Sequence, residues 1–228
     1  MKQILVFVML LFIFWVIYRK LITKEQKEGF AGDDCTVIKR IRRNDGVLVE
    51  IVNAECKEGL PHTTGPKTFR ITKDKWDGDR KDSIVKHEYV HLWQKSHPMN
   101  WAKFYKDAWG YDLLAQPPPD IDPALLRALR PNPDTAAAPW ALWKNKYLFF
   151  PIYSDGTRKL TNAKVIVWNT ETRAVEGIPE EWRRFFCVSN KCPSQFEHPH
   201  EIAAELYTEE IMSPATPSLL KFIKTSRK

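Results

Sequence analysis

The chain has 228 residues, a formal net charge of +7 and four cysteines. Its basic residues are spread along the chain and form no nucleic-acid-binding motif, so we read them as solvated charges and expect no nucleic-acid partner. The cysteines occur as two local pairs, a spacing that excludes a zinc ribbon. About 195 residues follow the N-terminal segment, enough for one domain with a substantial core.

An apolar N-terminal run predicts a membrane anchor. Residues 4–18 are all hydrophobic, a composition that no soluble domain would leave at a free terminus. These fifteen residues would span about 22 Å as a helix, short of a hydrocarbon core of roughly 30 Å, so flanking basic residues would have to reach the interface. A cleaved signal peptide ending near Gly29-Phe30-Ala31 is the alternative. The predicted organisation is a transmembrane anchor, a linker and one domain, at 1–22, 23–34 and 35–228.

The charges and the cysteines disagree on the side of the membrane that the domain occupies. Arg19, Lys20, Lys24 and Lys27 follow the apolar run, and the positive-inside rule then favours a cytoplasmic domain. Two close cysteine pairs favour an oxidising compartment, although free thiols stay open. The prediction is therefore a single-pass membrane protein in which the side of the domain is left open.

A β-hairpin is predicted between Cys35 and Cys56. Asp45-Gly46 is a type I′ turn signal between two β-rich runs. A two-residue turn at this place pairs residues whose numbers sum to 91, and 35 and 56 have that sum. The two cysteines would form a non-hydrogen-bonded pair of the hairpin, in which Cα atoms lie about 4.5 Å apart, within disulfide range. They should face each other unless a β-bulge separates them. Cys187 and Cys192 form the second close pair.

The run His87-Glu88-Tyr89-Val90-His91 is an H-E-x-x-H string in a segment that predicts a helix from about 83 to 96. Residues i and i+4 share one face of a helix, so both imidazoles can bind one ion, and zinc accepts such a pair. Glu88 follows the first histidine, where it can take a proton from a metal-bound water. Two histidines that only occupy a helix face are the alternative.

A catalytic zinc site takes three protein ligands, so the chain should supply one more. His97 lies where the metzincin pattern has its last histidine, but Gln94 replaces the glycine that this pattern needs for a sharp turn. Glu201 opens a helix predicted from 199 to 212, and Glu205 lies one turn further on the same face. Glu201 is the predicted third ligand, with His97 and Glu205 as alternatives. In the other interpretation of this pattern, Glu201 and Glu205 are only solvated charges on a helix surface and bind no metal.

The run Glu201-x-x-Ala204-x-x-Tyr207 resembles the third-ligand helix E-x-x-A-x-x-F/Y of several small gluzincin metallopeptidases. With the H-E-x-x-H string, the chain is similar to this family over two short helices, and the rest of the chain matches no family pattern. The resemblance implies that His87, His91 and Glu201 bind Zn²⁺ and that Glu88 is the general base.

The remaining elements complete an α+β, zincin-like fold. We expect a strand near 69–72, a helix at 100–115, a short helix at 123–130, strands at 147–153 and 163–168, and a short helix at 180–186. The Pro-rich stretch at 116–139 is expected to be a surface insertion rather than a lid. The predicted fold class is a small N-terminal β-hairpin or sheet with an active-site helix and a C-terminal third-ligand helix, preceded by one transmembrane helix.

These residues predict a membrane-anchored zinc metallopeptidase acting on a peptide or protein substrate. Zinc polarises the scissile carbonyl, and Glu88 removes a proton from the zinc-bound water and passes it to the leaving amine. An oxyanion stabiliser is also needed, for which Tyr153, His198 and His200 are the options. A catalytically inactive, membrane-tethered structural or interaction protein with the same fold is the alternative, and the presence of Glu88 argues against it.

Overall fold

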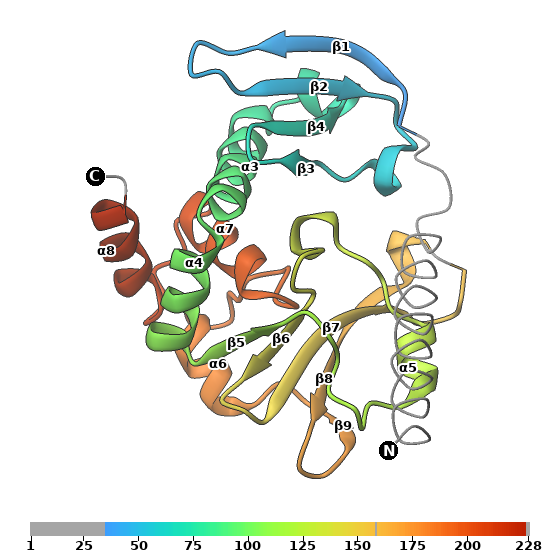
Figure 1. The fold of residues 1–228 in the computed structure, drawn as a ribbon, viewed down its shortest axis with the longest axis vertical. Coiled ribbons are helices and arrows are strands. Elements are labelled where there is room, and N and C mark those ends of the chain that lie inside the picture. Colours follow the sequence, from blue (N-terminus) through green and yellow to red (C-terminus); the bar gives the residue numbers. More distant parts are fainter. Residues whose placement is uncertain (1–34, 158, 227–228) are drawn as a thin grey trace, which may run out of the picture. The chain divides into compact units, whose positions relative to one another are not determined.

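The computed structural model describes residues 35–157 and 159–226 of the chain. They form two β-sheets that are connected and flanked by helices (Figure 1). This α+β architecture agrees with the prediction from the sequence. The second and larger sheet is a difference, because the predicted fold class named only a small N-terminal sheet and the strands predicted at 147–153 and 163–168 were not assigned to a second one.

The first sheet contains four strands in the order β1 (Val37–Arg42), β2 (Leu48–Val52), β4 (Thr68–Thr72) and β3 (His62–Gly65). β2 and β4 run parallel, and the other neighbours are antiparallel. α2 (Lys73–Asp77) leads from β4 to α3 (Lys81–Ser96). Alternate residues of β2 and β4 face one side of the sheet, where they pack on Val85 and Leu92 of α3. The sheet therefore supports the helix that carries the H-E-x-x-H string.

The turn between β1 and β2 is not the predicted two-residue turn. The backbone N of Arg43 donates to Val47 O at 2.9 Å, so the loop contains three residues, 44–46. Gly46 has a φ of +83°, the left-handed conformation that closes a three-residue turn with a bulge. Paired positions then sum to 90, and a second bulge after Val37 lowers the sum to 89.

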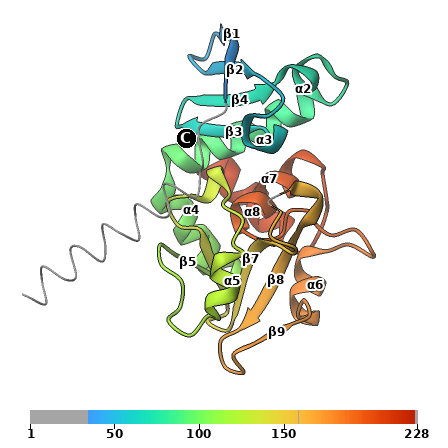
Figure 2. The same cartoon turned by 90° about the vertical axis from the view of Figure 1, so that its right-hand side faces the viewer.

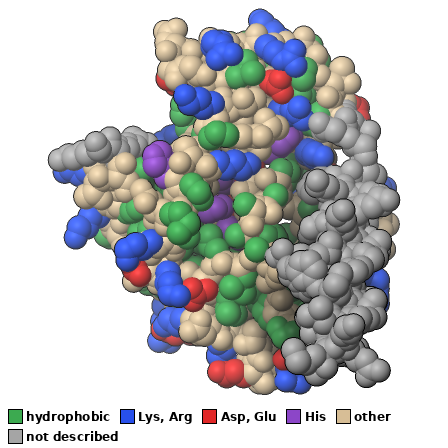
Figure 3. Space-filling model, viewed as in Figure 1, with side chains coloured by type: hydrophobic (Ala, Val, Ile, Leu, Met, Phe, Trp, Pro, Cys, Tyr) green, Lys and Arg blue, Asp and Glu red, His purple; other side chains and the backbone are tan. Residues whose placement is uncertain are grey.

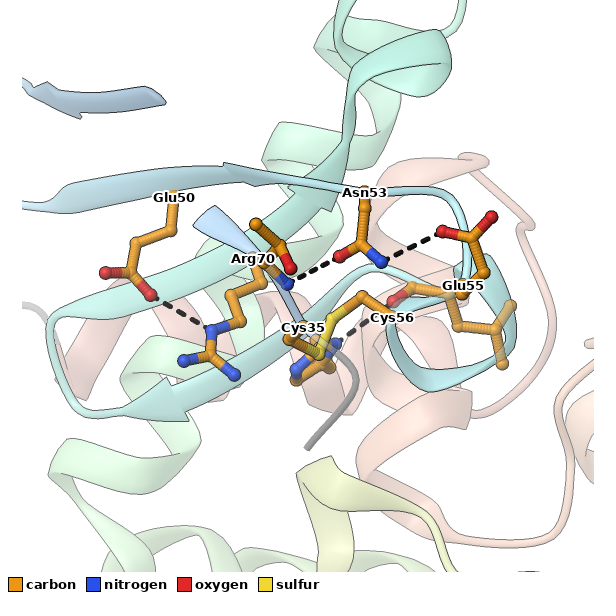
Figure 4. The surroundings of a disulfide bond; sticks show 9 residues. Cys35, Glu50, Asn53, Glu55, Cys56 and Arg70 are labelled. Carbon is orange, nitrogen blue, oxygen red and sulfur yellow. Dashed lines mark hydrogen bonds and ion pairs between the residues drawn. A yellow bond between two sulfur atoms is a disulfide. The ribbon is translucent and has the colours of Figure 1, made fainter. Parts of the chain in front are cut away.

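Cys35 and Cys56 nevertheless form a disulfide, with Cα atoms 4.4 Å apart (Figure 4). The predicted pairing is confirmed, but the predicted reason was wrong, because β2 ends at Val52 and the shifted register would place residue 54, not Cys56, opposite Cys35. Cys56 lies in a tight turn that opens η1 (Cys56–Gly59), and this turn brings it back beside Cys35. The pair Cys187 and Cys192 is also bonded, with Cα atoms 4.3 Å apart.

The helix predicted at 100–115 ends early. α4 (Pro98–Phe104) continues through one π-helical turn, η2 (Tyr105–Trp109), and Gly110 ends it with a φ of +74°. The next residues form β5 (Tyr111–Leu114), an edge strand of the second sheet. The left-handed glycine redirects the chain there, a change that the spacing of the aromatic residues did not indicate.

The second sheet is an antiparallel meander in the order β5-β6-β7-β8-β9. Its further strands are β6 (Trp140–Trp143), β7 (Tyr147–Tyr153), β8 (Ala163–Asn169) and β9 (Ala174–Glu176). Both faces are apolar, because Phe149 joins the core under the helices while Leu148 and Phe150 join a cluster beside α5 (Pro123–Arg127). β7 and β8 agree with the predicted strands, whereas the sequence pattern did not indicate β5, β6 or β9.

The C-terminal helices cover one face of the second sheet. α6 (Glu180–Phe186) has the predicted bounds, and α7 (Pro199–Thr208) begins at the predicted residue but ends before residue 212. α8 (Thr216–Ser226) follows and stacks Phe222 on Phe104, with ring centroids 4.5 Å apart. Both views place α7 beside α3, between the two sheets (Figure 1, Figure 2).

The end of the Pro-rich stretch is not a plain surface insertion. Its short turn η3 (Pro133–Thr135) lies against β3 and α3. The backbone N of Thr63 donates to the Asp134 carboxylate at 2.9 Å, and Lys95 Nζ reaches the same oxygen at 3.1 Å. Asp134 is buried, so these contacts tie the segment that precedes β6 to the first sheet.

The transmembrane part of the predicted fold class is corrected. Across residues 35–157 and 159–226, we find no helix with the length and apolar character needed to cross a membrane. The longest helix there, α3, has 16 residues and carries charges along its length, whereas a span needs about 20 predominantly apolar residues. The apolar run at 4–18, and with it the predicted anchor and linker, lies outside the described residues.

Candidate metal centre

α3 and α7 bring the two halves of the predicted motif together. α7 begins at Pro199, and the side chain of its N-cap residue His198 accepts a hydrogen bond from the backbone N of His200 at 3.1 Å. Further along α7, Ala203 and Ala204 are fully buried, and such small side chains allow two helices to approach closely. The first turn of α7 therefore faces the middle of α3.

Three potential ligand atoms converge between these helices. His87 Nε2 lies 3.0 Å from His91 Nε2, and Glu201 Oε2 lies 3.3 Å from the first and 3.2 Å from the second. His91 and Glu201 are buried, whereas the side chain of His87 is 17% exposed. Histidine side chains reach the surface between the parts of the chain that carry the two sheets (Figure 3). The structure thus assembles all three predicted ligands in one place.

Gln94 determines the orientation of His91. Gln94 Nε2 donates to the carbonyl oxygen of His200 at 3.0 Å, so its Oε1 atom points the other way and accepts from His91 Nδ1 at 2.7 Å. Because Nδ1 of His91 carries that proton, the lone pair of the neutral ring is on Nε2, which faces the two other ligand atoms. The residue that breaks the metzincin pattern thereby orients one of the two predicted histidine ligands.

The spacing of the three atoms fits a tetrahedral zinc ion. Two atoms bound to zinc at about 2.0–2.1 Å with a tetrahedral angle lie about 3.3 Å apart. The observed separations run from 3.0 to 3.3 Å. Two imidazole lone pairs and a carboxylate oxygen are all acceptors, so a cation among them favours the arrangement. Nitrogen and oxygen donors of this kind are a set that zinc accepts.

Glu201 and His91 stabilise each other's charged forms. Burial raises the pKa of Glu201, but the charge of His91 and hydrogen bonds from both histidines outweigh it and hold this pKa well below its usual range. Burial lowers the pKa of His91, but Glu201, followed by Asp134 and Glu88, outweighs it and raises the pKa to about 10. In the metal-free chain His91 therefore carries a proton that a metal ion has to displace.

Glu88 lines the same cavity and has an oxygen without a partner. It is 2% exposed, and its Oε2 atom makes no hydrogen bond to any described residue. Burial, followed by the charge of Asp134, raises the pKa of Glu88 well above its usual range. Buried polar atoms are normally hydrogen-bonded, so this oxygen is left available to a ligand rather than used by the fold.

The two alternative third ligands lie elsewhere. His97 is exposed at the C-terminal end of α3, where its Nδ1 lies 2.9 Å from Ser96 Oγ. Glu205 reaches the cavity, but its carboxylate accepts hydrogen bonds from Ser194 and, at 3.2 Å, from the backbone N of Gln195. Within the described part of the chain, neither joins the histidine pair.

A cavity of about 270 Å³ contains the candidate centre, and part of its wall comes from residues that sequence reasoning missed. These residues are Leu60, Pro61, Lys75, Arg130, Asn132 and Asp134. Asn132 Nδ2 donates to Glu201 Oε1 at 2.8 Å, although the two residues are 69 positions apart. The Asn-Pro-Asp order around Asn132 indicates a turn, but no sequence signal connects that turn to Glu201.

The three sequence-predicted oxyanion stabilisers are engaged elsewhere and do not line this cavity. Their polar atoms lie close to other groups of the fold: Tyr153 Oη 2.7 Å from Glu58, His198 Nε2 3.0 Å from the carbonyl of Ala138, and His200 Nδ1 3.1 Å from Tyr105. Burial lowers the pKa of His198 to about 4. Asn132 and Arg130 are two residues of the cavity lining whose side chains carry hydrogen-bond donors.

A second group of potential ligand atoms, in Cys35, Cys56 and His62, is closed by the disulfide. Its two sulfur atoms are bonded to each other and are not thiolates, which are the form that binds metal ions. His62 Nε2 is buried without a hydrogen-bond partner among the described residues, and Nδ1 lies 3.1 Å from the carbonyl of Leu60. The oxidised chain therefore presents only the group of His87, His91 and Glu201 as a complete set within its described residues.

No protein family, curated protein or solved structure matches the chain.

Proposed function

We propose that the chain is a zinc-dependent peptidase that hydrolyses peptide bonds at the centre formed by His87, His91 and Glu201. The observation that carries this proposal is the convergence of three acceptor atoms beside Glu88, a buried carboxylate with an unpartnered oxygen. A set of metal ligands and an available base in one cavity are the parts that metal-assisted hydrolysis requires.

The side chains around the centre have separate roles in this proposal. Zinc, when bound, supplies a Lewis acid that polarises the scissile carbonyl and lowers the pKa of water. His87, His91 and Glu201 hold the ion. Gln94 keeps the lone pair of His91 directed at it, and Asn132 holds the second carboxylate oxygen of Glu201.

Glu88 moves the proton. Its carboxylate accepts a proton from the attacking water and gives it to the leaving amine, so one water is consumed as the C–N bond breaks and a C–O bond forms. Burial, followed by the charge of Asp134, raises the pKa of Glu88 well above its usual range, which makes its carboxylate a stronger base than an exposed one.

The test compares metal content and turnover in the purified full-length chain. Wild type should bind one zinc ion and hydrolyse a peptide mixture, measured by elemental analysis and mass spectrometry. Glu88→Gln should keep the zinc and lower hydrolysis by at least about 100-fold, because the amide cannot accept the proton. Glu210→Gln, at an exposed position near the end of α7, is the matched control.

Each outcome bears on a different part of the proposal. Wild-type turnover in Glu88→Gln would remove Glu88 from the role of base. Stoichiometric zinc without hydrolysis of any peptide would favour the structural or interaction alternative over the peptidase.

A further inference from the structure

Two basic side chains that the proposed peptidase mechanism does not use line the cavity. Arg130 and Lys75 both line it, and both bond to neighbouring residues of η1. Arg130 Nε donates to Glu58 Oε2 at 3.1 Å, and Lys75 Nζ donates to the carbonyl of Gly59. The buried carboxyl of Glu197 is a second acidic group near Arg130, whose charge acts on it.

Arg130 has unused hydrogen-bond donors. The residue is 7% exposed, and its backbone N donates to Pro151 O of β7 at 2.9 Å, which holds it in place. Among the described residues, Nε is the one nitrogen of its guanidinium that makes a hydrogen bond, to Glu58. A guanidinium carries five N–H donors, so the four on the terminal nitrogens remain. Such a group binds a carboxylate through two parallel hydrogen bonds.

Glu58 determines which edge of the guanidinium is free. Its Oε1 accepts from Tyr153 Oη at 2.7 Å while its Oε2 accepts from Arg130 Nε. Lys57 and Glu58 have φ values of +44° and +60°, a left-handed conformation that costs energy for residues other than glycine and occurs preferentially at functional sites. The Nε edge of Arg130 is thus occupied, and the terminal nitrogens are left for a ligand in the cavity.

Arg130 lies close to the candidate metal centre. Asn132, two residues further along the chain, donates to Glu201 at 2.8 Å, and Arg130 lines the same cavity as the three predicted ligands. The cavity that they share has a volume of about 270 Å³. A carboxylate held by Arg130 would therefore place a neighbouring peptide bond at the centre.

We propose that Arg130 binds the C-terminal carboxylate of the substrate, with Lys75 as a second cation, so that the chain hydrolyses a peptide bond within one or two residues of the C-terminus. The inference rests on the proposed peptidase function and adds its substrate class. Water adds to the carbonyl of that bond, the C–N bond breaks, and Glu88 delivers the proton to the amine of the released C-terminal fragment.

The test uses N-acetylated tetrapeptides that differ only at the C-terminus, as free acid or as amide. The zinc-loaded full-length chain should prefer the acid in kcat/KM by about 10- to 100-fold, the ratio expected from charge-assisted hydrogen bonds. In Arg130→Met this ratio should fall to about one. Arg127→Met, an exposed arginine three residues earlier, should keep the wild-type ratio.

A binding measurement separates recognition from catalysis. Calorimetry with Glu88→Gln protein should show tighter binding of an N-acetyl dipeptide acid than of its amide, both with zinc and with a chelator. Adding Arg130→Met should remove that difference. Because Arg130→Met removes the ion-pair partner of Glu58 and leaves it only the hydrogen bond from Tyr153, the double variant Arg130→Met/Glu58→Gln removes both charges and controls for misfolding.

The outcomes distinguish this inference from the proposed function. Equal kcat/KM for acid and amide in wild type would overturn carboxylate binding and leave the peptidase proposal standing. An equal loss of kcat for both substrates in Arg130→Met would assign Arg130 to the developing oxyanion and also overturn it. If zinc-loaded wild type hydrolyses neither peptide, the peptidase proposal fails, and calorimetry alone decides whether Arg130 recognises a carboxylate.

Discussion

The two walls of the cavity are built in different ways. One wall consists of α3 and α7, regular helices that hold His87, His91 and Glu201 on facing sides through apolar packing and i, i+4 spacing. The other comes from irregular backbone, where Arg130 and Asn132 are held by individual long-range hydrogen bonds. In our proposals the helical wall binds the ion, and the irregular wall orients one ligand and recognises the substrate. Residues that act together at one centre can thus have very different sequence signals.

The largest effect should come from the helical wall. His91→Ala or Glu201→Ala should abolish stoichiometric zinc binding, because each removes one of three ligands. Zinc content after dialysis, measured by elemental analysis, checks this. His97→Ala and Glu205→Ala are the controls, and both should keep their zinc, since neither side chain lies with the histidine pair. Full zinc content in His91→Ala would end the metal-centre interpretation.

A buried carboxylate that precedes α7 should make the stability of the metal-free chain depend on pH. Burial, followed by the charge of Glu201, raises the pKa of Glu197 from 4.5 to about 7. Since the folded-state pKa is raised, the contribution of Glu197 to the stability of the folded chain is fully present below pH 4.5. It is lost as pH rises through about 7. Glu197→Gln should therefore change the free energy of unfolding more favourably at pH 8 than at pH 4.5. The difference between the two changes should be about 2–3 kcal/mol.

Urea unfolding in the presence of a chelator, at both pH values, measures that difference. If the variant and wild type lose the same stability between the two pH values, Glu197 is not the group responsible. Ionisation of this buried carboxyl group beside α7 would then not destabilise the metal-free chain.

A smaller effect should come from the residues that orient the ligands. Gln94→Leu and Asn132→Ala should each lower zinc affinity by about 10- to 100-fold, because each removes a hydrogen bond to a ligand side chain. Titration against a competing chelator gives the affinity, and the exposed Asn100→Ala is the matched control. Unchanged affinity in Asn132→Ala alone would show that the irregular wall does not support the metal centre.

Much of the local structure was predictable, but the connections between segments were less so. The bounds of β7 and α6 agree with the prediction, because apolar strands and short amphipathic helices are recognisable within a few residues. The helix predicted at 100–115 was wrong in its second half, where Gly110 adopts a left-handed conformation and the chain enters β5. The cysteine pairing at 35 and 56 was right although the assumed register was not, because a tight turn after β2 compensates for the shift.

The residue order alone is enough to place His87, Glu88 and His91 on one helix, since helical periodicity acts over four residues. It also narrows the third ligand to a few residues, because Glu201 opens a helix and has competitors in Glu205 and His97. Packing is what brings Glu201, and not Glu205 or His97, beside the histidines. Packing also brings Asn132 and Arg130 into the same cavity across about 70 residues of chain, a distance over which neither periodicity nor turn chemistry carries information.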